Sequence, residues 1–134
     1  MEKPGLMLIG SHHAREHLST EVPVLLLDHF VSEMKSNREF KTLMENRVIY
    51  VVPLLNPDGA IYDLKDREYQ LWRKNRRKNS GFFTTYGVDL NRNYSYGWGT
   101  GGSSSWSSSD VYMGKKPFSE PETQAVKKLS LIHI

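Results

Sequence analysis

Two short apolar runs, separated by a helix-length segment, most strongly constrain the fold of this 134-residue chain. The first run lies at residues 5–10 and the second at residues 48–55. Apolar runs of this length predict strands that are buried on both faces. Between them, apolar residues recur every four positions, which predicts a helix from Ser19 or Thr20 with Pro23 in its first turn. A strand, a helix and a strand in this order predict an α/β fold with parallel strand pairs.

The rest of the chain carries weaker local signals. Asn-Pro-Asp-Gly after the second apolar run is typical of a turn, and Ser119 with Glu122 three positions later is typical of a capping box before a helix. The further predicted elements are a short helix at 40–45, a turn at 56–59, a short strand at 88–90, a surface loop at 94–110 and a helix through Leu129.

Composition limits the classes of function. Apolar residues make up 38% of the chain, which is enough to fill a core and disfavours disorder. The absence of cysteine excludes disulfides, thiolate metal ligands and thiol nucleophiles, and no apolar run is long enough to predict a membrane span. The net charge of +3 is mild, and acidic residues interrupt the basic stretch at 65–78. A nucleic-acid-binding module based on that stretch is therefore disfavoured.

His13 and Glu16 are the first candidate site residues. A spacing of three places an imidazole and a carboxylate on nearly the same side of one helical turn, so both can face one cation. Such a pair is part of a zinc site of the kind used for metal-assisted hydrolysis. Taken alone the spacing is weak evidence, because a polar surface loop would show it too, and His12 could replace His13.

The first residues after parallel strands meet at one edge of a sheet, and His13, Asn56 and Asn91 all follow strand-like runs. Arg73 could stabilise an oxyanion beside a metal, or belong to a solvated basic stretch. The guanidinium of Arg92 beside the amide of Asn91 suits a carboxylate ligand.

The segment at 89–93 has a second possible role in the site. Asp89 could hold the ligating imidazole in one tautomer. Equally, Asp89 and the asparagines that follow it could simply satisfy a turn at the end of a strand.

Together these motifs resemble the zinc carboxypeptidases of the funnelin type (peptidase family M14), most closely the bacterial carboxypeptidase T-like enzymes. The resemblance covers most of the chain, from about Leu6 to Leu129. The motifs that carry it, in family order, are His13-Ala14-Arg15-Glu16, Asn56-Pro57-Asp58-Gly59, Trp72-Arg73-Lys74-Asn75-Arg76, Asp89-Leu90-Asn91-Arg92-Asn93 and Phe118-Ser119-Glu120-Pro121-Glu122.

The resemblance implies the fold and the roles of the site residues. The fold would be α/β, with a mixed, largely parallel sheet and flanking helices, present here in truncated form. His13 and Glu16 would bind Zn²⁺, and Asp89 would orient His13. Arg73 would be catalytic by polarising the scissile carbonyl. Asn91 and Arg92 would bind the substrate's terminal carboxylate, and Arg15 would contact the peptide further in.

The resemblance also implies residues that this chain does not supply. The family's third zinc ligand is a downstream histidine, whereas His133 lies too close to the last predicted helix and in a different context. The family's general-base glutamate and substrate-covering tyrosine lie later still. Residues 1–134 would thus be an incomplete catalytic domain, and residues 129–134 resemble a translated sequencing-adaptor remnant, a non-native tail.

The expected activity of the complete protein is hydrolysis of the C-terminal bond of peptides or proteins. We expect a monomeric, secreted enzyme without nucleic-acid partners, although this chain carries no signal peptide. Two alternatives remain open at this point. One is a non-catalytic pseudoenzyme of the same family that binds peptide C-termini, and the other is an amide hydrolase of the same fold that acts on acylated amino acids. The Asn91-Arg92 pair and the Trp-Arg-Lys-Asn-Arg motif favour a peptidase over the amide hydrolase.

Overall fold

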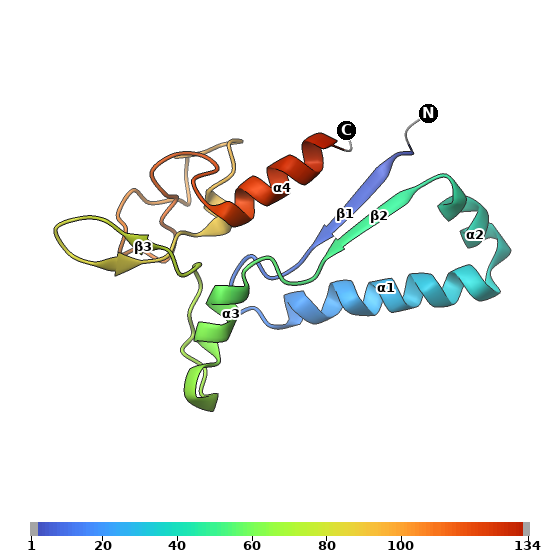
Figure 1. Cartoon of the computed structure of the whole chain (residues 1–134), viewed down its shortest axis with the longest axis horizontal. Helices are drawn as coiled ribbons and strands as arrows, with labels where there is room; N and C mark the ends of the chain where they lie inside the picture. The colour runs from blue at the N-terminus through green and yellow to red at the C-terminus, as the bar shows by residue number, and fades with distance from the viewer. Residues whose placement is uncertain (1–2, 133–134) are drawn as a thin grey trace.

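The computed structural model describes residues 3–132. Strands β1 (Gly5–Ile9) and β2 (Val48–Val52) pair in parallel, with Gly5 opposite Val48 and Ile9 opposite Val52. Helix α1 (Leu18–Ser36) connects them and runs along the strand pair, and α2 (Arg38–Glu45) leads back into β2 (Figure 1). The predicted strand–helix–strand unit with parallel pairing is confirmed.

The helices begin close to their predicted positions. Helix α1 starts at Leu18, so Pro23 is its sixth residue rather than part of its first turn, and that prediction was wrong. Helix α2 begins after Asn37, whose side-chain oxygen accepts a hydrogen bond from the Phe40 amide at 3.0 Å. Such a cap satisfies one of the amides that a helix leaves free at its N-terminus.

The two strands are less buried than the sequence predicts. Gly5 and Leu6 of β1 are exposed, and every residue of β2 is only partly buried. A two-stranded pair has little neighbouring structure to cover it, and α1 itself leaves Leu18 and Leu25 exposed. Burial of both faces of the strand pair would require more strands and helices than the described residues provide.

The segment after β2 is a helix rather than a simple turn. Helix α3 (Pro57–Asp63) begins directly after Asn56, whose side-chain oxygen accepts a hydrogen bond from the Gly59 amide at 3.0 Å. Pro57 occupies the first helical position, where its missing N–H costs nothing. The prediction of a turn at 56–59 was therefore wrong, and a short 3₁₀ helix, Lys65–Arg67, follows α3.

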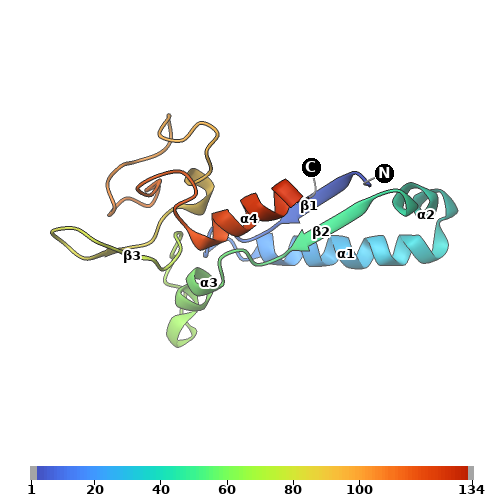
Figure 2. The ribbon, with the colours of Figure 1, turned by 45° about the horizontal axis from the view of Figure 1, so that its top comes forward.

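Residues 78–112 form loops around a small antiparallel pair, β3 (Lys78–Asn79) with β4 (Thr85–Tyr86) (Figure 2). The predicted strand at 88–90 is absent from this part of the chain, because its hydrogen bonds go elsewhere. The Asp89 amide donates to the Tyr112 carbonyl, and the Asp89 side chain caps the 3₁₀ helix Leu90–Arg92. The surface loop predicted at 94–110 is confirmed.

Helix α4 (Pro121–Ile132) ends the described chain. The predicted capping box is wrong, since the helix begins two residues after Ser119. The Ser119 hydroxyl instead donates to Glu120 Oε1 at 2.7 Å. Across residues 3–132, no helix has the length and apolar character needed to cross a membrane. His133 lies outside the described residues.

Gly10 is required where the chain leaves β1. A Cβ atom there would lie 1.9 Å from the Ser19 carbonyl oxygen and 2.6 Å from that of Pro53. Both contacts are with backbone, so a side chain cannot fit without moving α1 away from the strand pair. This close approach places the first turn of α1 beside the loop that carries His13.

We predict that Gly10→Ala in the full-length protein destabilises the fold by about 3 kcal/mol, the upper end of the usual range for overpacking, because it forces two backbone segments apart. Denaturant unfolding monitored by tryptophan fluorescence measures this change. Gly101→Ala is the matched control, since a Cβ at Gly101 meets nothing within 4 Å. It should change stability by less than about 0.5 kcal/mol. Equal effects of the two substitutions would contradict the role of Gly10.

Candidate active site

The loop after β1 is fixed by Ser19 of α1. The Ser11 amide donates to the Ser19 hydroxyl at 2.9 Å, and that hydroxyl donates to the Glu16 carbonyl at 2.6 Å. Ser11 has a positive φ of 54°, which is uncommon for a residue other than glycine. A hydrogen-bonded turn follows, with the Glu16 amide on the His13 carbonyl at 3.2 Å.

This turn brings the side chains of His13 and Glu16 together, as the spacing predicts. His13 Nδ1 lies 3.0 Å from Glu16 Oε1, and His13 Nε2 lies 2.9 Å from Asp89 Oδ1. His13 is buried, Asp89 is completely buried, and half of the Glu16 side chain is exposed. The imidazole therefore lies between two carboxylates, one in the interior and one at the surface.

The charge on Asp89 determines which nitrogen of His13 carries a hydrogen. Burial alone would raise the pKa of Asp89, but hydrogen bonding and charge from His13 and the guanidinium of Arg73 lower it below its usual value. An ionised Asp89 accepts a hydrogen bond from Nε2–H. In the neutral ring Nδ1 is then an acceptor, and it faces a carboxylate oxygen. Either a proton on Nδ1 or a cation between the two atoms satisfies this pair.

Arg73 completes the central cluster. Its Nε and Nη2 atoms lie 3.1 and 3.0 Å from Asp89 Oδ2, and its Nη1 lies 3.5 Å from Glu16 Oε1. The backbone assists, because the Arg73 carbonyl accepts a hydrogen bond from the buried Ala14 amide at 3.0 Å. His13, Glu16, Asp89 and Arg73 are thus brought together from three separate segments of the chain.

The donor set fits zinc in part. An imidazole nitrogen with a free lone pair and a partly exposed carboxylate are zinc donors, and a buried carboxylate on the other imidazole nitrogen is a typical supporting contact. A zinc ion in an enzyme has three protein ligands. Within residues 3–132, no group of three or more histidine, aspartate or glutamate side chains is placed to hold a metal ion. The described residues therefore bring together two groups of the kinds that bind zinc, the imidazole of His13 and the carboxylate of Glu16.

Asn91 and Arg92 lie beside a separate pocket of about 370 Å³. Arg92 Nε donates to the Gly102 carbonyl at 2.8 Å, and this hydrogen bond holds the guanidinium against the surface loop at 94–110. The backbone N–H of Asn91 donates to Asp89 Oδ1 at 2.9 Å, so Asp89 connects this segment to His13 and Arg73. The pocket is open at the surface and combines a cation with polar groups.

Arg15 contacts two segments that are distant in sequence. Its Nη1 donates to the Leu71 carbonyl at 3.1 Å and lies 3.4 Å from Asp110 Oδ2. The side chain is about one-third exposed, so this ion pair is screened by water. Arg15 therefore lies at the rim of the site, between two loops.

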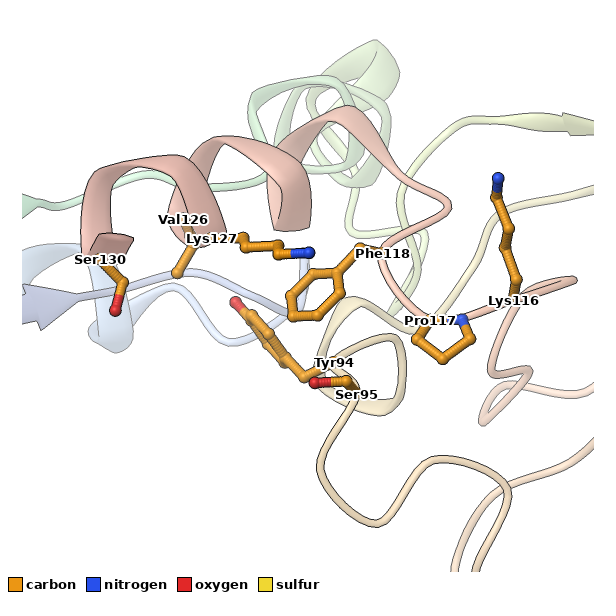
Figure 3. Close-up of a pocket in the computed structure, with 8 residues that line it drawn as sticks. All are labelled: Tyr94, Ser95, Lys116, Pro117, Phe118, Val126, Lys127 and Ser130. Atoms are coloured by element: carbon orange, nitrogen blue, oxygen red, sulfur yellow. The ribbon is translucent and has the colours of Figure 1, made fainter. Parts of the chain in front are cut away.

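His12 is not the partner of Glu16. Its Nε2 lies 2.8 Å from the Tyr94 hydroxyl, while His13 takes the position facing Glu16. Burial, followed by the charge of His13, lowers the pKa of His12, and burial raises the pKa of Tyr94 to about 12. Tyr94 also packs edge-on against Phe118, at a pocket under α4 (Figure 3).

Two buried asparagines support the site, and the sequence did not reveal their roles. Asn56 Nδ2 donates to the carbonyls of His12 and Lys74, both at 3.2 Å, which joins the loops that carry His13 and Arg73. The Asn-Pro pair could have indicated a helix N-cap. Asn93 Oδ1 accepts hydrogen bonds from the Glu120 amide and the Thr123 hydroxyl. We find no sequence signal for the role of Asn93.

The chain is similar in sequence to known zinc carboxypeptidases. The sequence model of the family described as zinc carboxypeptidase matches residues 1–133. A zinc carboxypeptidase of Saccharothrix mutabilis subsp. capreolus is 37% identical over 97 residues, which are 72% of this chain and 22% of that protein. Carboxypeptidase B of Astacus astacus is 35% identical over 126 residues, which are 94% of this chain and 40% of that protein.

Solved structures give the same result. The crystal structure of thrombin activatable fibrinolysis inhibitor superposes with a TM-score of 0.85 at 30% identity, covering 100% of this chain and 34% of that one. The chain thus spans less than half the length of the relatives it matches. Their names support a catalytic protein, and nothing in them favours a pseudoenzyme. By its sequence, its parallel α/β fold and its structural neighbours, this chain belongs to the zinc carboxypeptidase family, peptidase M14.

Proposed function

We propose that this chain is the first part of the catalytic domain of a secreted zinc carboxypeptidase, which removes C-terminal residues from peptides. The observation that carries the proposal is the His13–Glu16 pair, with Nδ1 and Oε1 3.0 Å apart and the other imidazole nitrogen held by buried Asp89. The short span relative to the family's members supports a third zinc ligand and a general base elsewhere in the full-length protein.

Some residues of this chain would bind the metal ion, and others would bind the substrate. Zinc, when bound, supplies a Lewis acid that polarises a carbonyl and lowers the pKa of a water molecule. His13 and Glu16 would hold the ion, and Asp89 would keep the His13 hydrogen on Nε2. Arg73 would donate hydrogen bonds to the oxygen of the scissile carbonyl as negative charge develops there.

The terminal residue would be selected by its carboxylate. An arginine fork beside an asparagine amide can bind a carboxylate with two or more hydrogen bonds, and Arg92 and Asn91 line one pocket. Arg15, at the rim, would contact the peptide further from its end. Binding the free carboxylate in this way would restrict cleavage to the last peptide bond.

The test of this function uses the full-length protein that contains this chain. With zinc present, we expect it to release the C-terminal residue of a peptide with a free carboxylate and to cleave the same peptide with a C-terminal amide only at a small residual rate. Mass spectrometry of the products distinguishes stepwise trimming from internal cleavage. Binding of the free peptide without any cleavage would overturn the proposed activity.

We predict that Arg92→Ala lowers kcat/KM for the free-carboxylate peptide by about 10–100-fold, because a hydrogen bond to a charged group contributes about 1.5–3 kcal/mol. The residual rate on the amidated peptide should not change, since that substrate has no carboxylate. Lys78→Ala, at an exposed position of β3, is the control and should leave both rates unchanged. Equal losses on the two peptides would contradict carboxylate binding by Arg92.

A further inference from the structure

Asp63, the last residue of α3, is a fully buried carboxylate with partners on two other segments. Its Oδ1 accepts a hydrogen bond from the Trp72 amide at 2.5 Å, and its Oδ2 accepts one from His17 Nε2 at 2.9 Å. Trp72 directly precedes Arg73, and His17 directly follows Glu16. One carboxylate therefore joins the segments that carry these two candidate site residues.

The Trp72 side of this link holds a constrained backbone. The Asp63 carbonyl accepts a hydrogen bond from the Gln70 amide at 2.8 Å, and the Asp63 side chain binds the amide two residues later. Leu71, between these two amides, has a φ of 54°, in the left-handed region that side chains disfavour. Hydrogen bonds on both sides can maintain such a conformation. The path of the chain into Arg73 is thus set by Asp63.

The His17 side of the link is also enclosed. The Tyr69 ring packs against the His17 ring with centroids 5.1 Å apart, and His17 is about one-third exposed. The Ser19 amide donates to the Glu16 carbonyl at 3.0 Å, so α1 begins where this link ends. The hydrogen bond from His17 to Asp63 therefore fixes the C-terminal side of the turn that carries Glu16.

A role limited to stabilising α3 does not account for these contacts. Asn56 caps the start of α3, and at its end the Leu64 amide donates to the Ala60 carbonyl. The Asp63 side chain therefore directs both of its oxygens outside its own helix. Burying a carboxylate costs free energy unless its oxygens are hydrogen-bonded. The partners of Asp63 are His17, next to Glu16, and Trp72, next to Arg73.

We propose that Asp63 is a positioning residue, which sets the spacing between the zinc-ligand turn at Glu16 and the carbonyl-polarising Arg73. This inference rests on the proposed function, because it takes Glu16 as a zinc ligand and Arg73 as the donor to the scissile carbonyl. Asp63 acts through Trp72 and His17 and touches neither the metal nor the substrate.

The experiment uses the full-length protein, with zinc affinity, the visible spectrum of the cobalt-substituted protein and steady-state kinetics as readouts. Asp63→Ala should weaken zinc binding by about tenfold or more, as is typical of groups that orient metal ligands. It should also shift the cobalt bands and lower kcat by at least about tenfold at saturating zinc, with KM within about threefold. His17→Ala should also weaken zinc binding, and it should lower kcat at saturating zinc less than Asp63→Ala does, because the Trp72 link remains.

Phe40→Ala is the control for a purely structural effect. The Phe40 ring of α2 packs against Phe30 near the C-terminal end of α1, with ring centroids 5.7 Å apart, whereas the turn at 13–16 precedes the other end of α1. Phe40→Ala should lower the melting temperature without changing zinc affinity, the cobalt spectrum or kcat. Should Asp63→Ala behave in the same way, the positioning role is wrong.

Two further outcomes are interpretable. If Asp63→Ala does not fold, Asp63→Asn preserves the side-chain volume and the acceptor for the Trp72 amide. Unchanged zinc affinity and an unchanged cobalt spectrum in both Asp63→Asn and His17→Ala would then overturn the proposal. If the wild-type protein binds zinc but releases no C-terminal residue, the proposed function fails. Zinc affinity and the cobalt spectrum still test the link to Glu16 in that case.

Discussion

Glu16→Gln in the full-length protein is expected to abolish stoichiometric zinc binding and to reduce peptide hydrolysis by about a thousandfold or more, because the metal contributes several kcal/mol to the transition state. Glutamine has the shape of glutamate but no charge, so it leaves the turn at 13–16 intact and removes an anionic donor. The Glu16 carboxylate lies 3.0 Å from His13 Nδ1 and is half exposed, in a position where an ion can reach it. Zinc content by mass spectrometry and kcat/KM at saturating zinc measure the two effects.

The matched control for this prediction is Glu21→Gln, which removes the same charge from an exposed position in the first turn of α1. It should bind one zinc ion and retain wild-type kinetics. A Glu16→Gln protein that keeps its zinc and loses less than about tenfold in rate would show that Glu16 is not a ligand. The metal would then be held by His13 together with residues elsewhere in the protein.

The sequence predicted those parts of the fold that depend on local periodicity. The two apolar runs and the four-residue repeat between them were enough for β1, α1 and β2 and for their parallel pairing. The turn predicted at 56–59 failed because Asn-Pro starts a helix as readily as it forms a turn. The strand predicted at 88–90 failed because its amides bind Tyr112 and Asn75 rather than a neighbouring strand.

Within the candidate site, the sequence indicated which residues take part better than it indicated which of them contact each other. The spacing of His13 and Glu16 follows from one turn of backbone, so it could be inferred locally. The contacts of Asp89 with both His13 and Arg73 join residues 76 and 16 positions apart. The sequence suggested only the first of them, from residue type and from the family resemblance. Asp63 had no signal at all, because its role comes from where α3 ends relative to two distant loops.

Arg73→Ala is expected to lower kcat by about 10²–10³-fold, the usual loss when one donor to a developing oxyanion is removed, while KM stays within about threefold. The guanidinium is only 15% exposed and is held by two contacts to Asp89 Oδ2 and one to Glu16 Oε1. These contacts hold the guanidinium beside Glu16, which the proposed function takes as a zinc ligand. Steady-state kinetics at saturating zinc, with zinc content measured on the same samples, checks the prediction.

Arg73→Lys separates the geometry of the Arg73 guanidinium from its charge. Arg38→Ala is the control. Lysine retains the positive charge but cannot contact Asp89 and Glu16 through one planar fork, so it should recover no more than about a tenth of the lost rate. Arg38, at the exposed start of α2, should be replaceable by alanine without any kinetic effect. A rise in KM alone would assign Arg73 to ground-state binding of the peptide. Loss of zinc from Arg73→Ala would instead mean that Arg73 acts through Asp89, by holding the carboxylate that orients His13.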